Sequence, residues 1–166
     1  MKSVRITKAD LIEALRSEPI NNFQAGKWAS NDQGLSTRDL ADERESCKVC
    51  AVGAIVRKVI SSNNSASAVC VISDSMTANA PIACVSMDRM ESFRDHLLAD
   101  ELYMNAISVM FESECHSLSS KSTNTVRKEM QNVIDRVISF IEERFPESFI
   151  WHPADHLPVK DDLVVI

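Results

Sequence analysis

Residues 45–60 decide the fold of this chain, and they read ESCKVCAVGAIVRKVI. Between positions 46 and 60 the apolar side chains cover more than half of a helical wheel, a pattern typical of a helix with protein on most sides. Lys48, Arg57 and Lys58 mark the remaining, wetter edge. The stretch therefore predicts a central helix over residues 46–60.

Further helices are predicted on both sides of this one. A short helix over residues 8–16 has Thr7 as its N-cap and Asp10 three residues later. Helices are also expected over residues 86–99 and 101–115, with one bent helix as the alternative. The clearest periodicity spans residues 125–145, where apolar side chains recur at spacings of three and four: Val126, Met130, Val133, Ile134, Val137, Ile141 and Phe145.

The remaining segments contain few signals for strands. Ser148-Phe149-Ile150-Trp151 is short, apolar and aromatic, which predicts an extended segment after Pro146. Residues 66–72 fit either a strand or a helix, and both alternatives stay open. Polar, flexible segments are expected near residues 61–65 and 117–124.

Length and composition predict one mainly α domain. The chain has 166 residues and only 3 glycines, which are few for a fold of many strands and turns. We expect a single globular domain over residues 1–166, a helical bundle with a minor extended or β element near the C-terminus.

The compartment predicted from sequence is the cytoplasm. No run of about 18 apolar residues is present, and the first ten residues lack the apolar core of a secretory signal, so a soluble protein without a membrane span is expected. The 5 cysteines are an odd number, which favours free thiols in a reducing compartment.

The charge of the chain argues against direct binding of nucleic acid. The formal net charge is −6, and no basic cluster of the kind that neutralises phosphates is present. An acidic surface suits a basic protein partner or simply solubility.

The Cys47-x-x-Cys50 pair admits three interpretations. With the His152-x-x-x-His156 pair it has spacings that zinc sites use, so a zinc-stabilised module or metal-dependent enzyme is the alternative hypothesis. A redox pair is disfavoured because acidic residues and no strand precede Cys47. We favour the third, in which both cysteines belong to the core, so no metal, no other cofactor and no catalytic residue is expected.

Two acidic side chains lie near the middle of the chain, at positions 112 and 114. Glu112 and Glu114 have no recognisable spacing for acid–base or metal chemistry, and a solvated face is expected for them.

Three segments together resemble a group of small bacteriophage or prophage proteins of uncharacterised function: CKVCAVGAIVRKVI, LYMNAISVMFES and IEERFPESFIW. The shared features are a C-x-V-C-A-V-G-A segment and a final helix that ends in Phe-Pro. The Ser/Asn-rich stretch over residues 61–80 departs from that pattern. The resemblance implies a phage setting and no catalytic residues.

These observations predict a non-catalytic phage-type protein that binds a host protein, with inhibition of a host defence or nucleic-acid-processing system as the expected consequence. Exposed aromatic and apolar side chains are the expected contacts: Trp28, Trp151, Leu163, Val164, Val165 and Ile166. The apolar stripe on residues 125–145 also permits a homodimer.

Overall fold

The computed structural model describes residues 4–24, 29–30, 48–63, 87–116, 118 and 122–152. These residues form a mainly helical structure with five α-helices: α1 (Lys8–Ser17), α3 (Ala51–Asn63), α5 (Met87–Ala99), α6 (Tyr103–His116) and α7 (Thr123–Arg144). A small antiparallel sheet joins β1 (Val4–Thr7) to β4 (Ser148–Trp151). The predicted mainly α fold with a minor β element near the C-terminus is confirmed.

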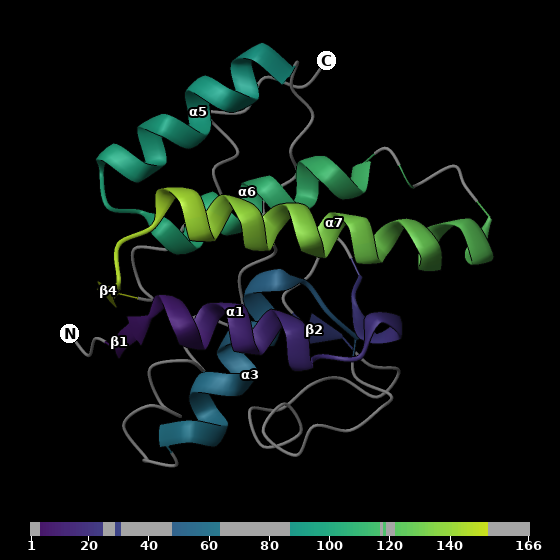
Figure 1. Cartoon of the computed structure of the whole chain (residues 1–166), viewed down its shortest axis with the longest axis horizontal. Coiled ribbons are helices and arrows are strands. Elements are labelled where there is room, and N and C mark those ends of the chain that lie inside the picture. The colour runs from purple at the N-terminus through teal and green to yellow at the C-terminus, as the bar shows by residue number, and fades with distance from the viewer. Residues whose placement is uncertain are drawn as a thin grey trace.

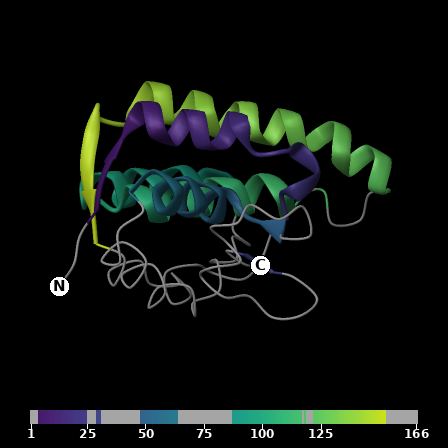
Figure 2. The same cartoon turned by 90° about the horizontal axis from the view of Figure 1, so that it is seen from below.

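Helices α1 and α7 lie side by side and run in opposite directions, as Figures 1 and 2 show. Helices α3 and α6 form a second layer beneath them, and α5 projects beyond α6 in Figure 1. The strand pair lies at the end of the layers where α1 begins and α7 ends. This arrangement follows from chain order, because β1 leads directly into α1 and α7 leads into β4.

The β1–β4 pair is built from two short alternating segments. Val4 lies opposite Trp151 and Ile6 opposite Phe149, and all four side chains are buried. Arg5 and Ile150, which are also opposite each other, face outward. The extended segment at residues 148–151 is confirmed, whereas sequence reasoning missed β1, because four residues give too short an alternation to identify alone.

Local capping signals fix the ends of α1 and α7. The Thr7 side chain accepts a hydrogen bond from the Asp10 backbone N–H at 3.1 Å, which confirms the predicted N-cap. Ser122 caps α7 in the same way, so that helix begins two residues earlier than predicted. Helix α7 ends at Arg144, because Pro146 disfavours helical backbone at the residue before it.

The central helix begins later than predicted. Residues 46–60 were expected to be helical, but Lys48–Val49 forms strand β3, which pairs with β2 (Ala29–Ser30). Helix α3 begins at Ala51 and continues to Asn63, so the polar segment expected near residues 61–65 is helical through position 63. Residues 48–49 form a strand because their backbone pairs with β2, and a local helical periodicity does not report pairing with a segment distant in sequence.

Helices α5 and α6 are separate, and a tight turn stops α5. The Leu102 N–H donates to the Leu97 carbonyl at 2.7 Å. The Glu101 N–H donates to the Leu98 carbonyl at 3.1 Å. This pair of bonds defines a Schellman motif whose C′ residue is Glu101, with φ of 62°. Glycine usually occupies that position, because a Cβ atom is unfavourable in left-handed backbone.

The apolar core lies between the two layers and against the strand pair. On α7, the side chains of the predicted stripe are buried at Met130, Val133, Ile134, Val137 and Ile141. Aromatic rings join the strand end to α6: Tyr103 lies 5.1 Å from Phe145 and 4.8 Å from Phe149, measured between ring centroids.

One ion pair is buried between α1, α3 and the short 3-10 helix η1 (Ile20–Asn22). Arg57 Nη1 donates to Glu18 Oε1 at 2.6 Å, and Asn22 Nδ2 donates to the same oxygen at 3.2 Å. The Arg57 and Glu18 side chains are 3% and 8% exposed. Arg57 was expected on the wet edge of its helix, and the structure contradicts that expectation.

None of the described helices combines the length and the apolar character that a membrane span requires. Residues 66–72 lie outside the described residues, and so do residues 117 and 119–121 of the segment expected to be flexible near residues 117–124. Within that segment, residues 123–124 belong to α7.

We predict that Glu18→Gln lowers the free energy of unfolding by about 3–5 kcal/mol, because it leaves the buried Arg57 guanidinium without its counter-charge. Glu13→Gln is the matched control, since Glu13 pairs with Lys58 at the surface and such pairs contribute about 0–1 kcal/mol. Urea denaturation of both variants measures the difference, and equal losses would contradict the prediction.

We predict that Glu101→Gly raises the free energy of unfolding by about 0.5–1 kcal/mol, because glycine adopts positive φ without the Cβ clash. Glu101→Ala keeps the Cβ atom and is expected to leave stability close to that of the parent. Thermal denaturation of the three proteins tests this, and a destabilised Glu101→Gly variant would show that the Glu101 side chain itself is needed.

Candidate functional site

Helix α6 contains a line of buried polar side chains. Its residues 104–112 are all buried, and four polar or thiol side chains recur among or just after them at spacings of three, four and three: Asn105, Ser108, Glu112 and Cys115. At about 100° per residue these four share one face of the helix. We call this set the α6 polar stripe.

The α6 polar stripe points away from α5 and α7. Met110 contacts Arg94 of α5, and Glu114 accepts a hydrogen bond from Arg136 of α7 at 2.7 Å. Both positions lie on the opposite side of α6 by helical geometry. The stripe therefore belongs to a different interface from the apolar contacts that hold the bundle together.

Cys50 belongs to the same neighbourhood, at the N-terminus of α3. Its Sγ accepts a hydrogen bond from the Gly53 backbone N–H at 3.4 Å, which is the geometry of a capping side chain. The charge of Glu112 acts on both the Cys50 and the Cys115 thiol. Two thiols and a carboxyl group are thus gathered where α3 packs against α6.

Both thiols are held in the protonated form. Burial raises the pKa of Cys50 from 9.0 to about 12, and it outweighs the bond from Gly53, which acts in the opposite direction. The pKa of Cys115 is raised as well, first by burial and then by the negative charge of Glu112. Since the thiolate is the nucleophile and metal ligand, neither cysteine is activated in this arrangement.

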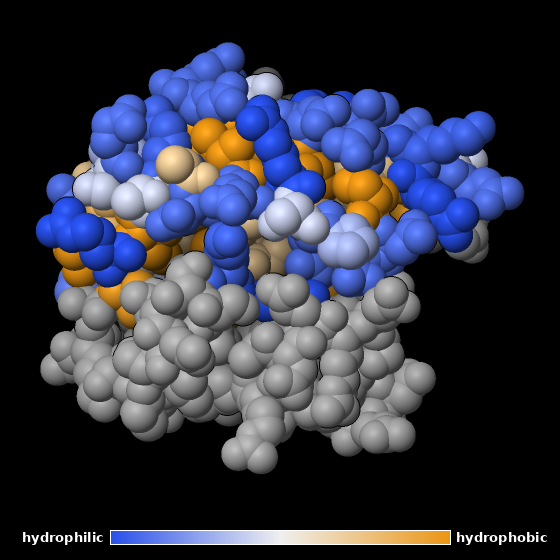
Figure 3. Space-filling model, turned by 60° about the horizontal axis from the view of Figure 1, so that its bottom comes forward, coloured by the Kyte–Doolittle hydropathy of each residue, from blue (hydrophilic) through white to orange (hydrophobic). Residues whose placement is uncertain are grey.

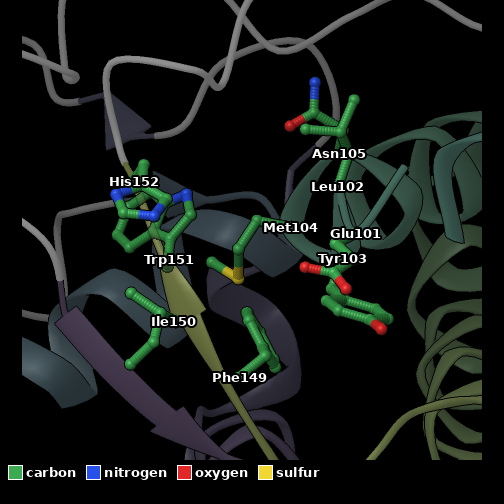
Figure 4. Close-up of a pocket in the computed structure, with 9 residues that line it drawn as sticks. All are labelled: Glu101, Leu102, Tyr103, Met104, Asn105, Phe149, Ile150, Trp151 and His152. Atoms are coloured by element: carbon green, nitrogen blue, oxygen red, sulfur yellow. The ribbon is translucent and has the colours of Figure 1, made fainter. Parts of the chain in front are cut away.

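A small cavity lies at one end of the α6 polar stripe, between the start of α6 and strand β4 (Figure 4). Its volume is about 30 Å³, enough for only one or two water molecules. The lining includes the positive-φ residue Glu101, the stripe residue Asn105 and the exposed His152. Ligand pockets for drug-sized molecules are roughly ten times larger, so this cavity does not define a small-molecule site.

Trp151, a predicted partner contact, and His152, from the alternative zinc set, both line this cavity. Trp151 is only 5% exposed, so its expected exposure is wrong: the alternation of β4 directs it into the core beside Phe149. Ile150, between them, faces outward and is 41% exposed. Trp28 and the four C-terminal side chains (Leu163, Val164, Val165 and Ile166) lie outside the described residues.

The alternative zinc set is only half described. Cys50 is buried at the start of α3 and His152 is exposed at the end of β4, whereas Cys47 and His156 lie outside the described residues. Among the residues that the structure does describe, no group of three or more His, Cys, Asp or Glu side chains could hold a metal ion.

Sequence reasoning missed the α6 polar stripe. Glu112 was expected on a solvated face together with Glu114, but the structure buries it to 6% exposure. The signal was present as the spacing of Asn105, Ser108 and Glu112 within an otherwise apolar helix. This spacing was not decisive, because polar residues recur at the same spacing on the solvent-exposed face of any amphipathic helix.

No protein-family model matches this chain, and no curated protein or solved structure is similar to it.

We predict that Cys50 and Cys115 resist iodoacetamide in the native protein at neutral pH and are alkylated in denaturant, because both are buried and their pKa values are raised. Peptide mass spectrometry after labelling reports each cysteine separately. Rapid alkylation of Cys50 in the native protein would contradict its burial and would show that its thiol is reactive.

Proposed function

We propose that the chain is a non-catalytic phage-type protein that binds a host protein and thereby inhibits a host defence or nucleic-acid-processing system. The observation that carries the binding part is the outer edge of strand β4, with Ile150 exposed beside it. The phage setting and the inhibition rest on the sequence resemblance and the acidic charge.

The register of the strand pair identifies the backbone groups at that edge. The Lys8 N–H donates to the Glu147 carbonyl at 2.8 Å, which makes positions 8 and 147 a hydrogen-bonded pair. Hydrogen-bonded and non-bonded pairs alternate along antiparallel strands. The N–H and C=O groups of Ser148 and Ile150 therefore point outward from β4, away from β1.

An extended segment of another protein can pair with such an edge. Within the described part of the chain the sheet has two strands, and no third strand pairs with β4. Strand addition supplies affinity through backbone hydrogen bonds and specificity through the neighbouring side chains. Ile150, at 41% exposure the only large hydrophobic side chain exposed among the described residues, is the natural apolar contact.

Among the described residues, no large hydrophobic side chain other than Ile150 is exposed. On the face drawn in Figure 3, apolar areas appear as patches separated by hydrophilic side chains. An open hollow between α1 and α7 is lined by Ala9, Ile12, Glu13, Arg16, Ser17 and Glu142. Arg16 and Glu142 are themselves paired at 3.6 Å.

The buried thiols support the non-catalytic part of the proposal. Cys50 and Cys115 are free cysteines among the described residues, and both are buried and protonated. The position of Cys50 fits the core role favoured for it, whereas Cys47 lies outside the described residues.

We predict that a tagged chain captures a host protein from a bacterial lysate in stoichiometric amount, that nuclease treatment does not release it, and that Ile150→Pro abolishes the capture. Proline removes the outward N–H of position 150 but no hydrogen bond between β1 and β4. Ile150→Val retains the N–H and a β-branched side chain, so it is the matched control and should capture normally.

Mass spectrometry of the retained proteins, with circular dichroism to verify that both variants fold, completes the experiment. Recovery of the bait alone would reject the binding proposal. Capture by folded Ile150→Pro at the parental level would reject the β4 edge as the binding surface. The host protein would then bind another part of the chain.

A further inference from the structure

Two arginines from different helices converge on one aromatic ring between α5 and α7. The Cζ atom of Arg94 lies 5.7 Å from the centroid of the Phe140 ring, and the Cζ atom of Arg144 lies 5.9 Å from the same centroid. Stacking against an aromatic ring restricts a guanidinium group and leaves its N–H edge directed elsewhere. Arg94, Asp95, Phe140 and Arg144 are together called the α5–α7 arginine site.

The charges in this site are not balanced. Asp95 of α5 pairs with Arg144 of α7, which neutralises one of the two guanidinium groups. Arg94 has no carboxylate within ion-pair distance among the described residues, and its Nη1 donates to a thioether, Met110 Sδ. A thioether is a weak acceptor. Among the described residues, the site therefore has one guanidinium group, that of Arg94, without a carboxylate partner.

Arg94 is also partly removed from water. Its side chain is partly buried, and its Nε atom is buried without a hydrogen-bond acceptor. Buried polar groups in folded proteins are nearly always hydrogen-bonded. Leaving such a hydrogen bond unmade is most unfavourable in free energy when the group is charged. Arg57 differs from Arg94 in having a carboxylate partner, because its Nη1 lies 2.6 Å from Glu18 Oε1.

We infer that the α5–α7 arginine site binds an oxyanion group, a carboxylate or a phosphate. The guanidinium N–H edge matches the oxygens of both groups, and the second guanidinium, from Arg144, adds to the attraction. This inference is independent of strand addition at β4, because the site is formed by side chains of α5 and α7.

The test is an NMR titration of ¹⁵N-labelled protein, in which the Nε–H signals of the arginines are followed. Sodium phosphate and sodium acetate are the probes, and sodium chloride at matched ionic strength is the control. A saturable shift of the Arg94 signal with either oxyanion supports the site. Saturation by phosphate alone identifies a phosphate-bearing ligand, and saturation by acetate alone identifies a carboxylate. Equal, unsaturated shifts in all three salts would overturn the inference.

Variants separate the site from general screening of charge. Arg94→Gln should weaken oxyanion binding about tenfold or more, the loss expected for a charge-assisted hydrogen bond. Arg127→Gln, an exposed position on α7, should bind as the parent does. Asp95→Asn should bind more tightly, because it frees Arg144. Parental affinity in folded Arg94→Gln overturns the inference, and so does parental affinity in Asp95→Asn if Arg94→Gln fails to fold.

Discussion

The pairing of residues 4–7 with residues 148–151 is the constraint on which the rest of the arrangement depends. It joins segments more than 140 positions apart and sets α1 and α7 side by side in opposite directions. The Lys8 side chain strengthens the same junction by donating to the Glu142 carbonyl at 3.0 Å. Closing so long a loop is entropically unfavourable, so four buried side chains on the inner face of the sheet must offset that loss.

The polar groups inside the molecule have two different characters. The Glu18–Arg57 ion pair joins α1 to α3, so its role is structural. The α6 polar stripe gathers an amide, a hydroxyl, a carboxyl group and a thiol on one face of a buried helix, next to the capping thiol of Cys50. Burial raises the pKa of both thiols, Cys50 and Cys115, and keeps them protonated in the core.

The two proposed binding surfaces use different chemistry at different places. The β4 edge offers unpaired backbone groups and one exposed isoleucine, as strand addition requires. The α5–α7 arginine site offers positive charge on an aromatic ring, which suits an oxyanion. Neither surface involves the residues first chosen as partner contacts, and Trp151 shows why: an aromatic side chain on a short strand is placed inward or outward by the strand's partner.

Local sequence signals predicted helices over residues 8–16 and 125–145, which the structure places at 8–17 and 123–144, and the extended segment at 148–151, because caps, periodicity and proline act within a few residues. Only the tertiary structure decided that Lys48–Val49 is a strand, that Glu112 and Arg57 are buried, and that Trp151 faces the core. Each of those outcomes depends on a segment distant in sequence, and local patterns carry no information about which segments will meet.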